Sequence, residues 1–474
     1  MKFTAAKSLD RFKKILSFRY LPFFTAALSL VCYYTGMDLV NMYIMTALGV
    51  SMLIVLDDLT PLICQLPFLY VMVSRTNSPS YTVGGSDYYF QTAVTVQCII
   101  LAVLFIGAML YRIVMLGVKR KFKPTPVFFG LCALSVTFLL NGVISKEYDP
   151  MNFAYGLAMA FFFLGIFVLF KDNINIGKNT FTDIAITFMA FSIVLITELT
   201  VAYLTSESLR TNGTIDRSEL MYGWGVHNSM GMLLVLCIPS ATYLAGKYRY
   251  GFVLTLYSLV LVIAAFLSMS RQAMIGGVIT YIICAIILLV KGKNRIANTL
   301  IIGFALICAI IVIGLKQDTI FSYFKKLFAN VVVNGELNGS GRWKIWKLGI
   351  ENFLSAPVFG AGFFVDIPQA AEMVGLGFIP LMYHDTFIQM LAACGILGLA
   401  AYLVHRVQTV ICYFKNVTVD RTFIAVTVLS MLILSIIDNH IFYIFPTMIY
   451  SSLIALLVKS QKTAKSALPS GNKN

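Results

Sequence analysis

Charged residues are scarce in this chain, and their scarcity excludes most soluble folds. Only 12% of the 474 residues are charged, whereas 59% are hydrophobic and the mean hydropathy is +0.84. A soluble globular domain is about one quarter charged. Runs such as "FVLTLYSLVLVIAAFLSM" can cross a bilayer core about 30 Å thick as helices. Because backbone groups cannot stay unpaired in lipid, we expect an all-α integral membrane protein, a polytopic bundle of about 12–14 transmembrane helices.

Motifs of several enzyme and transporter classes are also missing. The chain has no Gly-rich phosphate loop with a lysine, no HExxH and no nucleophile elbow around a serine, which disfavours ATP-driven transport and metalloprotease chemistry. The nine cysteines show no metal-ligand spacing and lie mostly in apolar runs. Intramembrane acids are few, whereas ion-coupled carriers need polar groups near the midplane. We expect no metal and no other cofactor.

The net charge of +15 is concentrated between alternate hydrophobic runs, in clusters such as "KSLDRFKK", "KRKFK", "KGKNR" and "HRVQ…FKNVTVDR". This is the positive-inside pattern, so the charge reports topology and does not point to nucleic acid. It predicts a multi-pass protein of the cytoplasmic membrane with both termini inside. The predicted spans are residues 21–37, 39–56, 61–73, 90–116, 126–144, 151–170, 181–204, 228–245, 251–269, 272–290, 297–315, 384–404, 422–437 and 441–458.

One connection is far longer than the others. Long ordered loops are more often functional than decorative, so residues 316–383 are expected to form a large extracytoplasmic loop of functional importance. Its segments "FSYFKKLFANVVV" and "GRWKIWKLGIENFL" have apolar residues at helical spacing beside lysines and arginine, which predicts two short amphipathic helices. The expected organisation is a basic cytoplasmic tail (1–20), a transmembrane bundle (21–315), this loop (316–383), C-terminal transmembrane helices (384–458) and a second cytoplasmic tail (459–474).

Polar residues gather at the predicted outer ends of the spans. His384 and Asp385 precede the apolar run "TFIQMLAACGILG", where Asp385 could simply cap a helix. Arg271, in "SMSRQ", occupies a tight turn between two apolar runs, and a charge there should face water, a partner or a ligand. Arg342 begins the second amphipathic segment. Two arginines at one membrane face would suit a diphosphate, because the guanidinium fork matches phosphate oxygens.

Further polar groups lie on the same predicted side. His227 and Asn228 begin a span in "WGVHNSMG", and "DNH" at 438–440 occupies the last outer turn. Lys344, Asn228 and Gln389 are weaker candidates for substrate contacts. The split of the four histidines between the two sides is close to chance and decides nothing by itself.

Four segments in order resemble the O-antigen ligase and polysaccharide polymerase superfamily: "WGVHNSMGMLLVLCIPSATYL", "VLVIAAFLSMSRQAMIGGVI", "SGRWKIWKLGIENFLSAPVFGAGF" and "HDTFIQMLAACGILGLAAYL". The similarity covers roughly residues 222–404. In the ligase members a histidine and a small polar residue are followed by nine residues and GxxG. Here these are His384, Asp385, residues 386–394 and "GILG", with Asp385 in place of the commoner asparagine, serine or glutamine. The family's "SR" corresponds to Ser270–Arg271.

The same resemblance extends into the loop. The family's arginine before a tryptophan-containing helix corresponds to Arg342, with Trp346 as the tryptophan, and its P-x-x-G-x-G turn to Pro357, Gly360 and Gly362. The resemblance implies a bacterial enzyme that transfers a glycan from undecaprenyl diphosphate to an acceptor hydroxyl at the outer face of the cytoplasmic membrane. It further implies membrane lipids, and a flippase and chain-length regulator of the same pathway, as partners.

We therefore expect Arg271 and Arg342 to stabilise the diphosphate leaving group and His384 to act on the acceptor hydroxyl. Asn228, His227, Lys344, Trp346, Asp385 and Gln389 are the expected substrate contacts. We expect a polymerase, which joins lipid-linked glycans, in preference to a ligase with a separate lipid or protein acceptor. The alternative from another class is a lipid-linked oligosaccharide flippase, which would more often place cationic residues in both halves of the chain.

Overall fold

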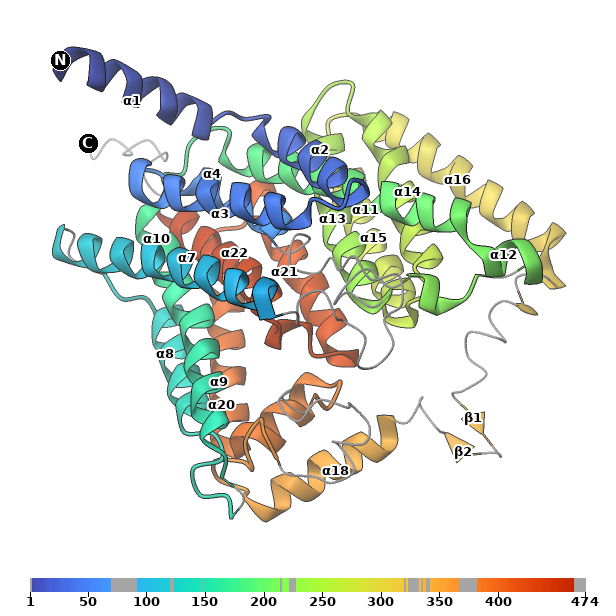
Figure 1. Ribbon diagram of the computed structural model, residues 1–474. Helices are drawn as coiled ribbons and strands as arrows, with labels where there is room; N and C mark the ends of the chain where they lie inside the picture. The colour runs from blue at the N-terminus through green and yellow to red at the C-terminus, as the bar shows by residue number, and fades with distance from the viewer. Residues whose placement is uncertain are drawn as a thin grey trace, which may run out of the picture.

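The computed structural model describes a helical protein, shown in Figure 1. Its only strands among the described residues are β1 (Val332–Val333) and β2 (Glu336–Leu337), which pair antiparallel. The polytopic helical fold predicted from composition is confirmed. The described residues are 2–69, 92–119, 123–146, 148–213, 215–220, 227–318, 321–322, 332–333, 336–337, 342–365 and 382–463.

Ten helices in the described part of the chain are long and apolar enough to cross a membrane. An eleventh span results if Lys7–Leu16 and Leu21–Tyr34, bent by 70° from each other, count together. Shorter apolar helices at Thr60–Leu69, Pro126–Leu139 and Phe252–Leu267 lie where full spans are predicted. Among the described residues the length criterion alone gives ten or eleven spans, and the three shorter apolar helices make up the difference from the predicted 12–14.

The N-terminal half begins with α1 (Lys2–Leu16) and continues through a series of apolar helices. A π-helical turn, η1 (Phe161–Gly165), joins two of them into one span. The other elements are α2 (Leu21–Tyr34), α3 (Asp38–Val55), α4 (Thr60–Ile63), α7 (Thr92–Lys119), α8 (Pro126–Leu139), α9 (Pro150–Ala160), α10 (Ile166–Asn173), α11 (Thr180–Thr205), α12 (Glu207–Asn212) and η2 (Arg217–Leu220).

The C-terminal half contains the helices that carry the predicted site residues. These elements are α13 (His227–Lys247), α14 (Phe252–Leu267), α15 (Arg271–Lys291), α16 (Arg295–Leu315), α18 (Arg342–Ser355), α20 (Thr386–Phe414), α21 (Val419–Ile437), η4 (His440–Phe442) and α22 (Ile444–Thr463).

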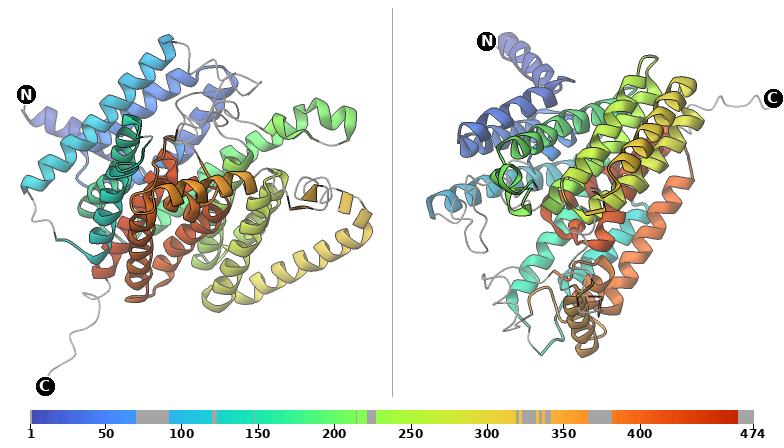
Figure 2. Two further views of the ribbon diagram at one scale, coloured as in Figure 1. Left: turned by 90° about the horizontal axis from the view of Figure 1, so that it is seen from below. Right: turned by 90° about the vertical axis from the view of Figure 1, so that its right-hand side faces the viewer.

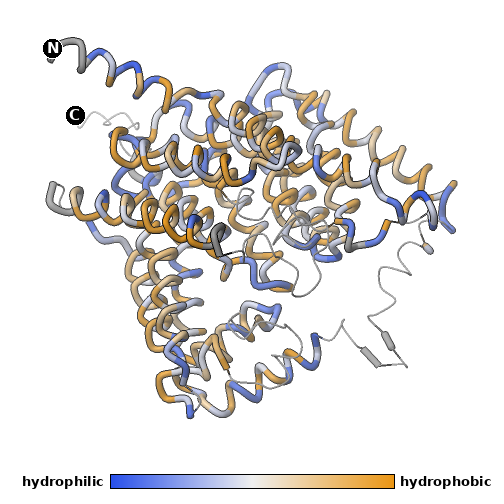
Figure 3. The backbone as a smooth tube through the Cα atoms, viewed as in Figure 1, coloured by the Kyte–Doolittle hydropathy of each residue, from blue (hydrophilic) through white to orange (hydrophobic). Residues whose placement is uncertain are grey.

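Helix α13 is the centre of this half. Its residues 229–245 are all buried, and it packs against α11, α14, α15 and α21. At the other extreme, α16 follows an outer edge of the bundle in Figures 1 and 2 and buries only Asn298. The Asn298 side chain accepts a hydrogen bond from Thr255 on α14 at 2.8 Å. Figure 3 shows the helices of the bundle predominantly hydrophobic along their length, as expected for helices that lie in lipid.

Helix α20 is broken near its start. Gly395 has a φ of +67° and a ψ of −165°, which are not helical values. A Cβ atom at this position would lie 2.3 Å from the carbonyl oxygen of Val358, so only glycine fits. The turn at 357–362 is hydrogen-bonded to the break: Ile396 N donates to Pro357 O at 2.9 Å, and Ala361 N donates to Ala392 O at 2.7 Å. The first glycine of "GILG" therefore separates the short segment at residues 386–394 from the long remainder of α20.

The same turn is held from the N-terminal half. Asn152 on α9 accepts a hydrogen bond from Phe364 N at 2.7 Å and donates one to Phe364 O at 3.0 Å. Asn141, after α8, accepts a bond from Phe363 N at 3.3 Å. Both asparagines are buried, and a buried amide is stable only when its partners are present. The N-terminal half thus anchors Phe363 and Phe364, which directly follow the turn after α18.

Helix α20 also extends beyond the predicted span, which ends at residue 404. His405 and Arg406, predicted as part of an inner basic cluster, lie within α20, and the Tyr450 hydroxyl on α22 contacts both side chains. The Arg406 guanidinium lies 4.6 Å from the centre of the Tyr450 ring. The basic residues mark only the approximate end of the transmembrane span, because an arginine can lie inside a span when tyrosine side chains contact it.

The predicted amphipathic helices have different outcomes. The second is confirmed as α18, whose only buried residue is Gly349; a Cβ there would lie 2.5 Å from Ile388 of α20. Trp343 is 50% exposed. The first prediction, over residues 321–333, falls mostly outside the described residues, and its last two residues belong to β1.

Candidate functional site

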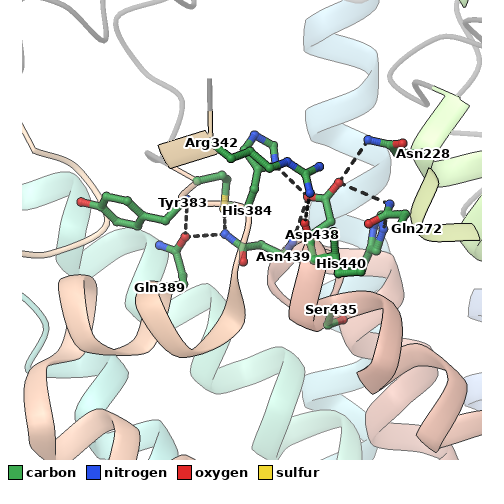
Figure 4. Close-up of polar contacts among 12 residues, drawn as sticks. Asn228, Gln272, Arg342, Tyr383, His384, Gln389, Ser435, Asp438, Asn439 and His440 are labelled. Carbon is green, nitrogen blue, oxygen red and sulfur yellow. Dashed lines mark hydrogen bonds and ion pairs between the residues drawn. The ribbon is translucent and has the colours of Figure 1, made fainter. Parts of the chain in front are cut away.

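The candidate site lies where α13, α15, α18 and α20 begin and α21 ends. Its centre is Asp438, the C-cap residue of α21. His384, Asn228, Gln272 and His440 surround it, and we call these five residues the Asp438 cluster. In Figure 4, His384 and Arg342 approach Asp438 from one side and Asn228 and Gln272 from the other.

His384 makes the shortest contact with the Asp438 carboxylate. His384 Nδ1 lies 2.8 Å from Asp438 Oδ1. The side chain of His384 is 34% exposed, whereas that of Asp438 is 5% exposed. Because a carboxylate only accepts hydrogen bonds when ionised, this contact places a proton on Nδ1 of His384. The other ring nitrogen, Nε2, can then accept a proton from another molecule.

Asp438 remains ionised despite its burial. Its Oδ2 accepts from Asn228 Nδ2 and from Gln272 Nε2, each at 3.4 Å, and its Oδ1 also accepts from Asn439 N at 2.9 Å. Burial by itself would raise the pKa of Asp438. The hydrogen bond from His384 and the positive charge of the Arg342 guanidinium oppose that penalty, and the pKa of Asp438 lies below its usual range.

Arg342 connects the amphipathic helix to this centre. As the first residue of α18, it donates from Nη1 to the carbonyl of Ile437 at 2.6 Å. The last carbonyls of a helix have no intrahelical partner and carry partial negative charge, so a cation is favourable there. One edge of the guanidinium is therefore used to hold α18 against the end of α21.

Arg271 is bracketed by two residues of the cluster's hydrogen-bond system. Ser270 caps α15 by accepting from Ala273 N, and its hydroxyl donates to Asn228 Oδ1 at 2.9 Å. Gln272, on its other side, contacts Asp438. The "SRQ" segment is thereby fixed at the cluster on both sides of Arg271, whose side chain is half-buried.

Asp385 is a helix cap, as one of the sequence interpretations allows. Its Oδ1 accepts from Phe387 N and Ile388 N, both at 2.8 Å. Burial raises the pKa of this carboxyl, although the two N–H groups oppose the shift. His384, just before the cap, has a φ of +53°. Such left-handed backbone costs a non-glycine residue about 1–3 kcal/mol and is typical of functional sites.

Gln389 supports this corner from inside. It is fully buried, and its Oε1 accepts from Tyr383 N at 3.0 Å and from Asn439 Nδ2 at 2.6 Å. Tyr383 also accepts a bond from Asn352 on α18 at 2.6 Å. The residues immediately before His384 and immediately after Asp438 are therefore tied to one glutamine.

The other sequence-predicted residues are placed less centrally. His227 begins α13 beside Asn228 and is half-buried. Lys344 is exposed on α18. Trp346 is half-buried, with its ring centre 5.3 Å from that of Trp343.

Sequence reasoning missed three members of the Asp438 cluster. Asp438 and His440 lie in an outer turn that was noted but given no role, and Gln272 was overlooked beside Arg271. The available signal was the polar run "DNH" between two apolar spans. Sequence spacing cannot reveal its partner, because 54 residues separate His384 from Asp438.

A small cavity elsewhere does not coincide with this cluster. It is lined by residues that include Tyr243, Lys291 and Phe423 and has a volume of about 40 Å³, enough for a few waters. These residues belong to the opposite ends of α13, α15 and α21 from the cluster. Within the described ranges, no group of three or more His, Cys, Asp or Glu side chains is arranged to hold a metal ion.

Comparison with known proteins identifies part of the chain. A search of curated proteins gave no match. Residues 256–403 match the family model described as O-Antigen ligase. The matched region contains Arg271, Arg342 and His384, whereas Asn228 and Asp438 lie outside it. This match and the multi-pass helical fold support a similarity of residues 256–403 to the O-antigen ligase and polymerase superfamily, which indicates an enzyme of a glycosyltransferase type.

Proposed function

We propose that this protein is a polysaccharide polymerase that transfers a glycan from undecaprenyl diphosphate to the hydroxyl of an acceptor sugar. The observation that carries the proposal is the 2.8 Å contact between His384 Nδ1 and Asp438 Oδ1. It orients the imidazole, leaves Nε2 as a base, and supplies a negative charge that stabilises the imidazolium formed when Nε2 takes a proton. An acceptor hydroxyl needs such a base, and a partner that stabilises the protonated base, to become a nucleophile.

The two arginines are assigned to the diphosphate leaving group. When the bond between the anomeric carbon and the phosphate oxygen breaks, its electron pair stays on the diphosphate, and fixed cations stabilise that charge. Arg342 has one nitrogen on Ile437 O, and its other N–H groups are assigned to the diphosphate. Arg271 is assigned to the same group, since Ser270 and Gln272 hold its backbone at the cluster.

The reaction balances without a further reactant. The acceptor oxygen forms a bond to the anomeric carbon, the bond to the diphosphate breaks, and the acceptor proton passes to His384 Nε2. Attack opposite the leaving group inverts the anomeric centre. The reaction as proposed needs no metal.

The remaining predicted site residues are assigned either to substrate contacts or to positioning. Asn228, Lys344, His227 and Trp346 are proposed to contact substrate, and Lys344 is the most accessible of them. The cap formed by Asp385 and the burial of Gln389 support positioning roles, since both orient the chain next to His384.

The site is proposed to face the outside of a bacterial cytoplasmic membrane. The support is the charge at the opposite helix ends, where Lys247 ends α13, Lys291 ends α15, and Lys415 follows α20. Lysine and arginine accumulate on the cytoplasmic side of membrane proteins.

A ligase is the alternative, supported by the description of the matching family. Polymerase is preferred because Asp385 departs from the ligase pattern and no feature specifies a separate acceptor. The test is to incubate the purified protein with lipid-linked repeat unit and to analyse the products. Longer lipid-linked glycans are expected. Transfer only after a second lipid or protein acceptor is added would indicate a ligase, and movement of the lipid across vesicles without a covalent product would indicate a flippase.

A further inference from the structure

A second histidine lies on the far side of the same carboxylate. His440, in η4, is buried and has its Nε2 2.8 Å from Gln272 Nε2. The Gln272 nitrogen also lies 3.4 Å from Asp438 Oδ2. Asp438 is therefore flanked by two imidazoles, one exposed to incoming molecules and one enclosed. Proton transfer at the site depends on which of the two can carry charge.

The orientation of the Gln272 amide follows from its neighbours. Amide nitrogen and oxygen differ little in shape, so their hydrogen-bond partners decide which is which. The atom facing Asp438 Oδ2 must be the NH₂ group, because an amide oxygen there would meet a carboxylate oxygen without a proton between them. Gln272 Oε1 is buried and has no hydrogen-bond partner among the described residues, so the amide depends on its NH₂ contacts.

The amide orientation determines the protonation of His440. An amide NH₂ group can only donate, so the His440 Nε2 that it meets must be an acceptor. The ring is then neutral and carries its single proton on Nδ1, which is buried without a hydrogen-bond partner among the described residues. We propose that Gln272 is a positioning residue that keeps His440 in this neutral form. The Asp438 carboxylate then stabilises positive charge on His384, and only His384 exchanges protons in the reaction.

The surroundings of His440 support the same state. The charged groups that act on it are Asp438, His384 and Arg342. Burial lowers the pKa of His440; Asp438 opposes that shift, whereas His384 and Arg342 reinforce it. A charged His440 would also add positive charge beside His384 and disfavour the imidazolium that the reaction creates there.

Asn228 provides the matching contact on the other helix. Its Oδ1 accepts from the Ser270 hydroxyl at 2.9 Å, which turns its Nδ2 toward Asp438 Oδ2. Two side-chain amides, from α13 and α15, thus donate to the same carboxylate oxygen. Of the side chains in the Asp438 cluster, His384 is the one that contacts Oδ1. This arrangement rests partly on the proposed function, but the state of His440 can be measured without it.

The direct test is nitrogen NMR of ¹⁵N-histidine-labelled protein in nanodiscs. The chain has only four histidines, and the His440 signals are those lost in His440→Asn. We expect a neutral ring with Nδ1 protonated and Nε2 bare across about pH 6–8, a range in which an ordinary histidine near pKa 6.5 titrates. A ring protonated on Nε2, or one that titrates in this range, would overturn the proposal.

Two variants test the role of Gln272. Gln272→Glu offers His440 a carboxylate acceptor, so Nε2 of His440 should become protonated. Gln272→Met keeps the volume but removes both donated bonds, and His440 should then titrate. In both, the transfer rate should be reduced about 10- to 100-fold at pH 6 and less at pH 8, because a charged His440 competes for Asp438. The control is Gln65→Met, which removes another buried glutamine, one that accepts from Thr25 at 2.9 Å.

The outcomes separate the two proposals. An active protein whose His440 carries a proton on Nε2 would overturn the role of Gln272 and leave the transferase standing. Equal losses at pH 6 and pH 8 in Gln272→Met, with the His440 signals unchanged, would also overturn it. A protein that fails to transfer glycan but has the expected His440 tautomer would overturn the proposed function and leave the hydrogen-bond assignment intact.

Discussion

His384 Nδ1 lies 2.8 Å from Asp438 Oδ1, although the two residues belong to different helix ends 54 positions apart in the chain. The contact joins the start of α20 to the end of α21. A second bond reinforces it, since Thr386 donates to Ser435 O at 2.5 Å. The proposed acceptor base and its carboxylate are therefore held at the ends of two neighbouring helices, and helices position a site more accurately than loops do.

Replacing His384 should remove the acceptor base. We expect His384→Gln to lower the transfer rate about 10²- to 10⁴-fold, the usual contribution of general base catalysis, with donor affinity largely retained. The measurement is product formation per folded protein, with binding of the lipid diphosphate donor assayed separately. The matched control is His405→Gln, a buried histidine further along α20 that bonds Tyr450. Wild-type rates in His384→Gln would contradict the assignment.

Arg342 should be needed for its fork as well as its charge. We expect Arg342→Gln to reduce the transfer rate about 10²- to 10³-fold, because a donor to the developing anion is lost. Arg342→Lys should recover part of it, since lysine cannot bond Ile437 O and the diphosphate with one planar group. Steady-state kinetics with varied donor will measure both. Lys347→Gln, which removes an exposed lysine on the same helix, is the control and should stay near wild type.

Asp385 should affect stability more than chemistry. Loss of its cap in Asp385→Ala is expected to destabilise the protein by about 0.5–2 kcal/mol, whereas Asp385→Ser retains an acceptor for the helix N–H groups. Thermal unfolding in detergent gives the first quantity, and activity below the melting temperature the second. A large rate loss in Asp385→Ser with unchanged melting would instead show that the carboxylate takes part in the reaction.

Asp438 should make the protein sensitive to acid. Its pKa in the folded state is lowered, so the unfolded state binds more protons, and Asp438 contributes stability that is present above about pH 4 and is lost below it. Melting temperatures between pH 6 and pH 3 should therefore fall more steeply in the wild type than in Asp438→Asn. Parallel curves for the two proteins would show that the pKa of Asp438 is not lowered.

The break in α20 should not tolerate a side chain. Gly395→Ala is expected to lower the melting temperature and the activity together, because the new Cβ meets Val358 O and the backbone is left-handed. Gly303→Ala, on α16, is the matched control: no atom lies within 4 Å of a Cβ there. Its stability should be unchanged or raised, since alanine favours helix. Equal effects of the two substitutions would contradict a specific role for the break.

Much of the architecture could be predicted from local pattern. Long apolar runs have no alternative to helices in lipid, so the bundle, the apolar character of α16 and the amphipathic α18 are visible in the sequence. The boundaries were less accurate: α20 continues past residue 404 through His405 and Arg406 because Tyr450 packs against the arginine. Hydropathy has no information about such a partner.

The sequence by itself determined which chemistry was available: a histidine, two arginines and several amides at the ends of apolar helices, in an order that resembles one superfamily. Only the tertiary structure decided how they act. It paired His384 with Asp438, made Asp385 a cap, enclosed Gln389, and brought Gln272 to a second histidine. The physical reason is that hydrogen bonds between side chains depend on distances of about 3 Å and on direction, which arise only when distant helices pack together.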